Sequence, residues 1–189
     1  MTGLILTLLL VAVLGIYILV YNGLGRAVTQ VDQGWAGIEV QLKRRHDLVP
    51  GLVTAVKSAL KHENAIFDRI LDARTEAMKA MAGHDPETMA HTEAALASSL
   101  KGLIAYVEDN PEITATANVA TFQKQLEETE DQIAASRRLY NGNVQNLNAR
   151  IVTFPGNIIA SAHRFRQAKP FEMTPAERAV TYERPQIDL

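Results

Sequence analysis

The chain has 189 residues, a formal net charge of −2 and no cysteine. Its 19 Lys and Arg residues are interspersed with 21 Asp and Glu residues, so no basic stripe of the kind that follows a phosphate backbone stands out. This composition argues against a nucleic-acid-binding protein.

The first element along the chain is an apolar run over residues 3–20 that contains no charged side chain. A helix needs about 20 apolar residues to cross a hydrocarbon core of about 30 Å, and this run meets that requirement. A cleaved signal peptide is the alternative, but no basic region precedes the run and residues 21–25 do not form a small-residue cleavage site. We therefore expect residues 1–25 to be a transmembrane anchor.

The basic residues around this anchor all follow it, beginning at Arg26. Because basic flanks stay on the cytoplasmic side, this bias predicts an N-terminus outside and a body in the cytoplasm. The length that remains is enough for one domain with a sizeable core, which we assign to residues 26–155.

Apolar residues in the first part of this domain recur at steps of three and four, the pattern of an amphipathic helix. The stretch ends at Gly83, where we expect a helix C-terminus with a positive φ. Pro50 either kinks one long helix or lies in the first turn of a second helix capped by Asp47. The expected apolar positions are Val28, Val31, Trp35, Ile38, Leu42, Leu52, Val53, Val56, Leu60, Phe67, Ile70, Leu71, Met78 and Met81.

Two further helices are predicted from cap signals. Asp85 and Pro86 supply the cap and first-turn proline of one helix, and Asn110 and Pro111 those of a long final helix that Pro155 stops. Short connections between long helices predict antiparallel neighbours. The expected fold is all-α: an N-terminal transmembrane helix followed by an antiparallel up-and-down helical bundle. The apolar positions of the two helices are Met89, Leu96, Leu100, Leu103 and Val107, then Val119, Phe122, Leu126, Ile133, Tyr140, Val144, Leu147, Ile151 and Phe154.

The final helix is expected to extend about 60 Å, roughly twice the length of the helix before it. Its apolar seam is covered by the first arm of the chain if that arm continues through Pro50. Otherwise the seam would protrude and pair with another copy, as in a coiled coil. The sequence therefore raises self-assembly as a hypothesis.

Catalytic and metal-binding patterns are weak. The five histidines form no i, i+3 or i+4 pair with one another, and no Glu-x-x-His motif of a di-metal bundle occurs. A G-x-S-x-G elbow and a glycine-rich phosphate loop are also missing from the sequence. We therefore expect no enzyme activity, no metal site and no cofactor.

Two polar clusters interrupt the apolar seams. Residues 41–47 form either a solvated face or a contact site, in which Lys43, Arg44 and Arg45 meet anionic lipid or acidic residues of a neighbour at about 1 kcal/mol for each basic side chain. Residues 137–143, followed by Asn146 and Asn148, are unusually rich in Asn for a helix interior. A structural network that bonds across helices and fixes their register is the favoured interpretation of this second cluster, and a ligand or partner surface is the alternative.

After Pro155 the chain enters the last expected region, residues 156–189. Residues 157–166 are apolar on one side and end in Arg164, Phe165 and Arg166, which we expect to contact a partner or lipid. This short segment lies either in the bilayer interface or on the end of the bundle. From Lys169 onward, prolines and acidic residues predict an extended tail.

Long segments of the chain resemble the LemA family of bacteria. The resemblance lies in residues 35–50, in the pair at 62–63, in residues 137–144 and 154–160, and in Phe165 and Phe171–Glu172. It marks a set of polar and aromatic family positions as structural: Trp35, Asp47, His62, Glu63, Arg137, Tyr140, Asn141 and Asn143.

The resemblance implies a single-pass inner-membrane protein with a cytoplasmic antiparallel bundle and no established enzyme activity. A magnetosome-forming relative points toward membrane shaping, and neighbours that carry a TPM domain suggest a membrane partner. The leading hypothesis is a non-enzymatic scaffold on the lipid bilayer that forms a homo-oligomer. The alternative is a monomeric adaptor that regulates a membrane-bound partner such as a TPM-domain protein.

Overall fold

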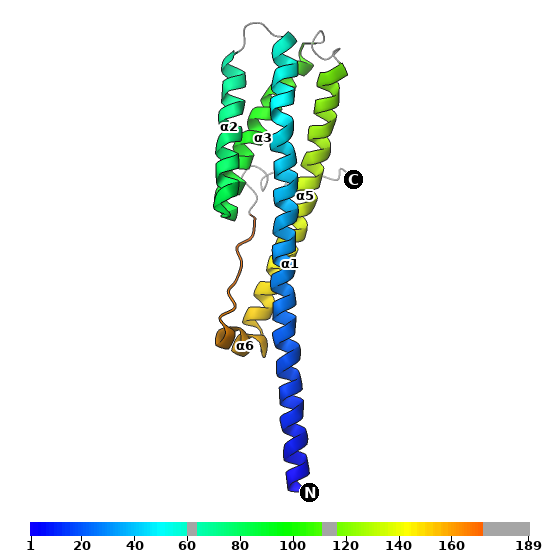
Figure 1. Cartoon of the computed structure of the whole chain (residues 1–189), viewed down its shortest axis with the longest axis vertical. Coiled ribbons are helices and arrows are strands. Elements are labelled where there is room, and N and C mark those ends of the chain that lie inside the picture. Colours follow the sequence, from blue (N-terminus) through cyan, green and yellow to red (C-terminus); the bar gives the residue numbers. More distant parts are fainter. Residues whose placement is uncertain (60–63, 111–116, 172–189) are drawn as a thin grey trace, which may run out of the picture. The chain divides into compact units, whose positions relative to one another are not determined.

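A computed structural model describes residues 1–59, 64–110 and 117–171 of the chain. These residues form five helices: α1 (Thr2–Ala59), α2 (Asn64–Gly83), α3 (Pro86–Glu108), α5 (Ala117–Val152) and α6 (Gly156–His163) (Figure 1). Over the described ranges there is no β-strand. The predicted all-α fold, with an apolar N-terminal helix that leads into a helical bundle, is confirmed.

Helix α1 is one continuous helix of 58 residues with Pro50 inside it. Of the two alternatives for Pro50, the structure therefore has the single long helix, and Asp47 lies within α1 instead of capping a second helix. The N-terminal part of α1 is long and apolar enough to cross a membrane, with a mean hydropathy of 2.9 over 18 residues, none of them buried.

The ends of the shorter helices test the predicted caps. Asp85 is the N-cap of α3, its carboxylate accepts a hydrogen bond from the backbone N–H of Thr88, and Pro86 is the first helical residue, as predicted. Helix α2 does end at Gly83, but the residue with positive φ is His84, at 54°. The expectation that Gly83 takes this conformation is therefore wrong by one residue. The predicted start of the final helix, at Pro111, lies outside the described residues.

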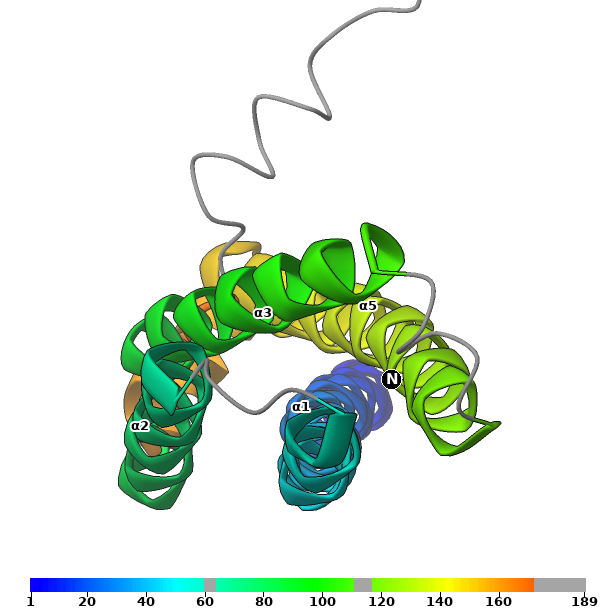
Figure 2. The ribbon, with the colours of Figure 1, turned by 90° about the horizontal axis from the view of Figure 1, so that it is seen from above.

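The chain divides into two compact units. The described residues within 39–135, together with Phe171, make the four-helix unit, in which the last part of α1, then α2, α3 and the first part of α5 run in alternating directions (Figures 1 and 2). Residues 1–38 and 136–170 make the anchor unit, which contains the first part of α1, the last part of α5 and α6.

The four-helix unit has a continuous apolar core. Phe67 and Ile70 of α2 face this core as predicted, but Leu71 and Met78 remain 36% and 41% exposed. Their expected places are taken by Ala77 and Ala80, which are buried. Small side chains bring the helices closer together, so the periodic pattern alone misplaced the face of α2 by part of a turn. Leu60, another expected core position, lies outside the described residues. Core side chains from the other helices include Val49, Leu52, Val56, Leu96, Leu100, Leu103, Val107, Val119 and Leu126.

The apolar seam of α5 is buried along its length in both units. Leu126 and Ile133 are buried in the four-helix unit, and Val144 and Leu147 are buried in the anchor unit. Because α1 is continuous, the alternative in which this seam protrudes and pairs with a second copy does not apply. Phe154, which was expected to belong to the seam, is 79% exposed in the turn after α5.

Candidate functional site

The four-helix unit contains a buried cluster of charged side chains. Arg45 of α1 donates one hydrogen bond to Glu93 Oε2 of α3 at 3.1 Å and a second to Glu130 of α5. The neighbouring His46 lies with Nε2 2.6 Å from Glu93 Oε1. The side chains of Arg45 and Glu93 are only 4% and 6% exposed. We call Arg45, His46 and Glu93 the buried polar cluster, and Glu130, whose side chain is 58% exposed, contacts it from the surface.

Helix α2 adds a contact that explains how α1 tolerates Pro50. In an uninterrupted helix the carbonyl of His46 would accept a hydrogen bond from the N–H of residue 50, but proline has no N–H. Arg74 of α2 supplies the missing donor, because its Nε donates to the His46 carbonyl oxygen at 2.7 Å. Polar side chains of all four helices of this unit therefore meet around His46.

The sequence analysis did not predict this cluster. Glu93 falls between Met89 and Leu96 on the buried side of α3. Arg45 likewise falls between Leu42 and Val49, which are both fully buried. The signal available in the sequence was a charged residue at a position where the apolar spacing predicts a buried side chain. Such a residue indicates a buried ion pair, because a buried charge requires a partner of opposite sign.

The predicted contact residues of the first polar region lie in different environments. Lys43 and Arg44 are exposed, and Arg44 lies 3.9 Å from the exposed carboxylate of Glu128. Arg45 is buried with partners in its own chain, which leaves it no surface for lipid or another protein. Asp47 is exposed within α1. His62 and Glu63 lie outside the described residues.

In the anchor unit, α1 and α5 approach each other at Gly34. A Cβ at Gly34 would lie 3.0 Å from the Cα of Tyr140 and 3.2 Å from Asn143 Nδ2, so a larger residue would require α5 to move by a few tenths of an ångström. The rings of Trp35 and Tyr140 pack at a centroid distance of 5.4 Å. Asn143 Nδ2 donates to the carbonyl of Gln30 in α1 at 2.7 Å. Residues of the second polar region thus bond across helices at this point.

The chain after α6 is held to α5 by the same polar region. Tyr140 donates from its hydroxyl to the carbonyl of Lys169 at 2.8 Å. Asn148 both donates to the Ala168 carbonyl and accepts from the Ala168 N–H, each at 2.9 Å. Burial, together with the negative charge of Asp32, raises the pKa of Tyr140 above its usual value, which keeps the phenol a donor. Arg137 and Asn141 are half-buried.

Helix α6 packs against the first part of α1. Ile159 and Ala160 of α6 are buried together with Leu24. The ring of Tyr21 lies 4.8 Å from the ring of His163 and 5.9 Å from that of Phe165. Of the two alternatives for this segment, packing onto the helices is therefore observed. Such packing does not preclude a bilayer contact, because Ile158 remains 60% exposed and Arg164 and Arg166 are exposed beside it.

Within residues 1–59, 64–110 and 117–171, no group of three or more His, Asp or Glu side chains is arranged to hold a metal ion. Two polar atoms in this part of the chain, Gln41 Oε1 and His46 Nδ1, are buried without a hydrogen-bond partner.

The chain is similar to three magnetosome proteins. It is 26% identical over 161 residues to the magnetosome proteins MamQ 1 and MamQ 2 of Paramagnetospirillum magneticum, in matches that cover 73% of this chain. It is 22% identical over 190 residues to MamQ of Magnetospirillum gryphiswaldense, covering 88% of this chain and 70% of that protein. The chain spans only 59% of the length of the two Paramagnetospirillum proteins.

A family model supports the same assignment over most of the chain. The LemA family model matches residues 34–188, which begin just before Trp35 and include residues 39–135 of the four-helix unit. The apolar helix and the helical bundle agree with a membrane-associated protein. The chain therefore belongs to the LemA family.

Proposed function

We propose that this protein is a membrane-anchored, non-enzymatic scaffold that self-assembles and organises or shapes the bacterial inner membrane. The observation that carries the proposal is the continuity of α1. The same 58-residue helix supplies a fully exposed apolar segment long enough to span a bilayer and core side chains of the four-helix unit. The similarity to magnetosome proteins supports a role in membrane organisation.

The proposed orientation places the N-terminus outside and the helical units in the cytoplasm. In the sequence no Lys or Arg precedes Arg26, whereas Lys43, Arg44 and Arg45 follow it soon afterwards. This asymmetry around the apolar segment supports the orientation, because basic flanks resist translocation.

Self-assembly is proposed to use the outer face of α2. Leu71 and Met78 are seven residues apart and therefore lie on one side of the helix, where both are exposed. A single-pass anchor also concentrates copies of the protein in two dimensions. A narrow apolar stripe of this kind would supply a contact between copies, and the membrane would raise the local concentration of those copies.

The test is the mass distribution of the full-length protein in mild detergent. We expect assemblies larger than a dimer, and we expect Leu71→Glu with Met78→Glu to disperse them into a small species. The matched control is Arg69→Glu, which changes the net charge by the same amount on an exposed position of α2 away from the stripe. A chain that starts at Asn22 should assemble less, because it lacks the membrane segment.

A single small species for the full-length protein would contradict the scaffold. The adaptor alternative would then lead, and a TPM-domain protein retained during purification would support it. Assemblies that persist in the Leu71→Glu and Met78→Glu variant would contradict the α2 surface but not assembly itself.

A further inference from the structure

The anchor unit has a charge balance opposite to that of the rest of the chain. Residues 1–38 and 136–170 contain seven Lys and Arg residues and a single acidic residue, Asp32. The remaining residues contain 12 Lys and Arg against 20 Asp and Glu. A net charge of −2 for the whole chain therefore conceals a strongly basic unit around the apolar helix.

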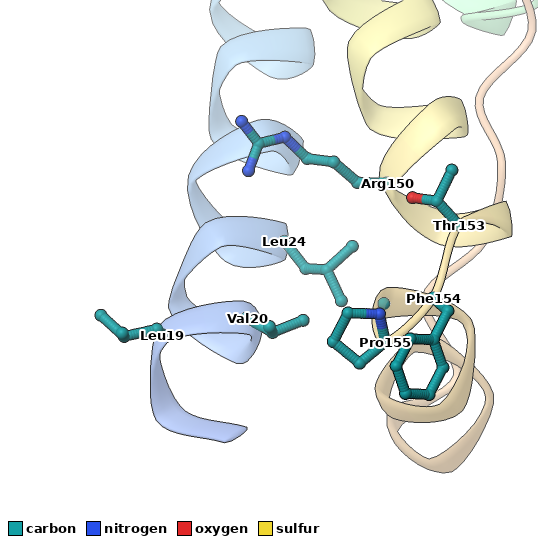
Figure 3. Close-up of a pocket in the computed structure, with 8 residues that line it drawn as sticks. Leu19, Val20, Leu24, Arg150, Thr153, Phe154 and Pro155 are labelled. Carbon is teal, nitrogen blue, oxygen red and sulfur yellow. The ribbon is translucent and has the colours of Figure 1, made fainter. Parts of the chain in front are cut away.

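A groove in this unit lies between α1 and the turn that follows α5. It has a volume of about 270 Å³. Leu19, Val20 and Leu24 form the α1 wall, and Phe154 and Pro155 form the opposite wall. Figure 3 shows the polar residue Arg150 at one end of the groove, with Leu19, Val20 and Phe154 toward the other. We call this cavity the lipid groove.

The guanidinium of Arg150 is held in place without a carboxylate partner. Its Nε donates to Asn146 Oδ1 at 3.0 Å on the same helix, and the described part of the chain places no acidic side chain within ion-pair distance of it. Gly23 of α1 gives it room, because a Cβ there would lie 3.1 Å from Nη1. The two Nη groups therefore remain available to an anion that enters the groove.

Ring contacts set the depth of the groove relative to the apolar segment. Tyr21 directly follows the apolar run of residues 3–20, and its ring packs on both His163 and Phe165. A tyrosine at the end of a membrane-spanning segment lies at the headgroup level. Leu19 and Gly23 are four residues apart, about 6 Å along the helix. The apolar end of the groove therefore lies at the level of the acyl chains, and Arg150 lies at the level of the headgroups.

We propose that the lipid groove binds one anionic phospholipid, with its phosphate against Arg150 and an acyl chain along Leu19 and Phe154. Leu19 and Phe154 are 68% and 79% exposed at a level where their surroundings are lipid. The basic charge of the anchor unit favours an anionic over a zwitterionic headgroup. The inference rests on the membrane anchoring of the proposed function and is independent of self-assembly.

The experiment uses the full-length protein in phosphatidylcholine vesicles that carry spin-labelled phosphatidylglycerol or spin-labelled phosphatidylcholine. Electron paramagnetic resonance measures the immobilised fraction of each lipid. We expect phosphatidylglycerol to be preferred about fivefold, the effect of one basic side chain at an anionic surface. Arg150→Gln should abolish the preference. Gly23→Leu should do the same while it keeps every charge, because it fills the place of the guanidinium.

Arg138→Gln is the matched control, since it removes the same charge from an exposed position of the same helix, twelve residues before Arg150. It should leave the preference intact. An equal loss of the phosphatidylglycerol preference in Arg138→Gln and Arg150→Gln would overturn the lipid groove, because the preference would then come from the overall positive charge of the unit. Equal binding of the two lipids, an unchanged preference in Arg150→Gln, or displacement of the label by glycerol phosphate would overturn it as well.

Extraction with alkaline carbonate separates this proposal from the anchoring on which it rests. A chain that stays in the vesicles but shows no lipid preference overturns the lipid groove alone. A chain released by carbonate overturns both the anchoring and the groove.

Discussion

In the four-helix unit the polar contacts at the centre include buried charged side chains, whereas in the anchor unit helix α5 reaches backbone carbonyls through uncharged amides and a phenol. Arg45, His46 and Glu93 are buried together in the first case. Asn143, Asn148 and Tyr140 bond to backbone carbonyls in the second. The two units therefore differ in how much each polar contact contributes to specificity and stability.

The two kinds of contact differ in stability because of the group that stays buried when one partner is removed. A buried charge without its partner costs about 3 to 5 kcal/mol, whereas the loss of a neutral hydrogen bond costs about 1 kcal/mol. The charges of the anchor unit are instead placed at its surface: Arg26, Arg164 and Arg166 are exposed. We infer that the four-helix unit uses charge to fix its packing, and that the anchor unit keeps charge for the membrane surface.

The largest expected effect is that of Glu93→Ala. The substitution removes the carboxylate that Arg45 and His46 share and leaves Arg45 with only the exposed Glu130 among the described residues, so we expect the free energy of unfolding to fall by about 3 kcal/mol, the lower end of the range for a lost buried partner. Denaturant unfolding of the full-length protein in detergent, followed by circular dichroism, measures the change. Glu87→Ala on the exposed first turn of the same helix is the control and should cost at most about 1 kcal/mol. Equal losses in the two variants would show that the buried polar cluster does not hold this unit together.

A smaller effect is expected where Arg74 donates to the carbonyl that Pro50 leaves without a partner. Arg74→Ala should cost about 2 kcal/mol, because it leaves the buried carbonyl of His46 without a hydrogen-bond donor. Pro50→Ala restores an N–H to α1, so the same Arg74→Ala change should then cost about 1 kcal/mol less. The four proteins of this double-mutant cycle are compared by the same unfolding measurement. A coupling energy near zero would mean that Arg74 does not compensate for Pro50.

Local signals in the sequence predicted the elements well. Asp85 and Pro86 define the start of α3 through their own backbone and side-chain chemistry, so no tertiary information was needed. The periodicity of α3 likewise identified its buried side from Met89 to Val107. The displacement of positive φ from Gly83 to His84 shows the limit of such signals, since the glycine is the last helical residue and the residue after it takes the left-handed conformation.

Contacts between helices could not be predicted in the same way. Glu93 acquires its role from Arg45 and His46, which lie 48 and 47 residues away. The choice of Ala77 over Met78 at the core depends on how closely α2 approaches its neighbours, which hydrophobic spacing does not encode. Arg150 and Gly23 form the polar end of the lipid groove only because the last part of α5 lies beside α1.

The smallest expected effect concerns close packing in the anchor unit, where alanine substitutions at two glycines should change the free energy of unfolding in opposite directions. Gly34→Ala adds a Cβ 3.0 Å from the backbone of Tyr140, so overpacking should outweigh the gain in helix propensity and cost about 1 kcal/mol. Gly142→Ala meets no atom within 4 Å and should stabilise α5 by about 0.5 to 1 kcal/mol. Trp35 is the single tryptophan and packs on Tyr140, so its fluorescence during denaturant unfolding reports this unit. If both variants were stabilised, the helices would have room to separate, and the anchor unit would owe its register to the amide bonds of Asn143 and Asn148 instead of to the contact at Gly34.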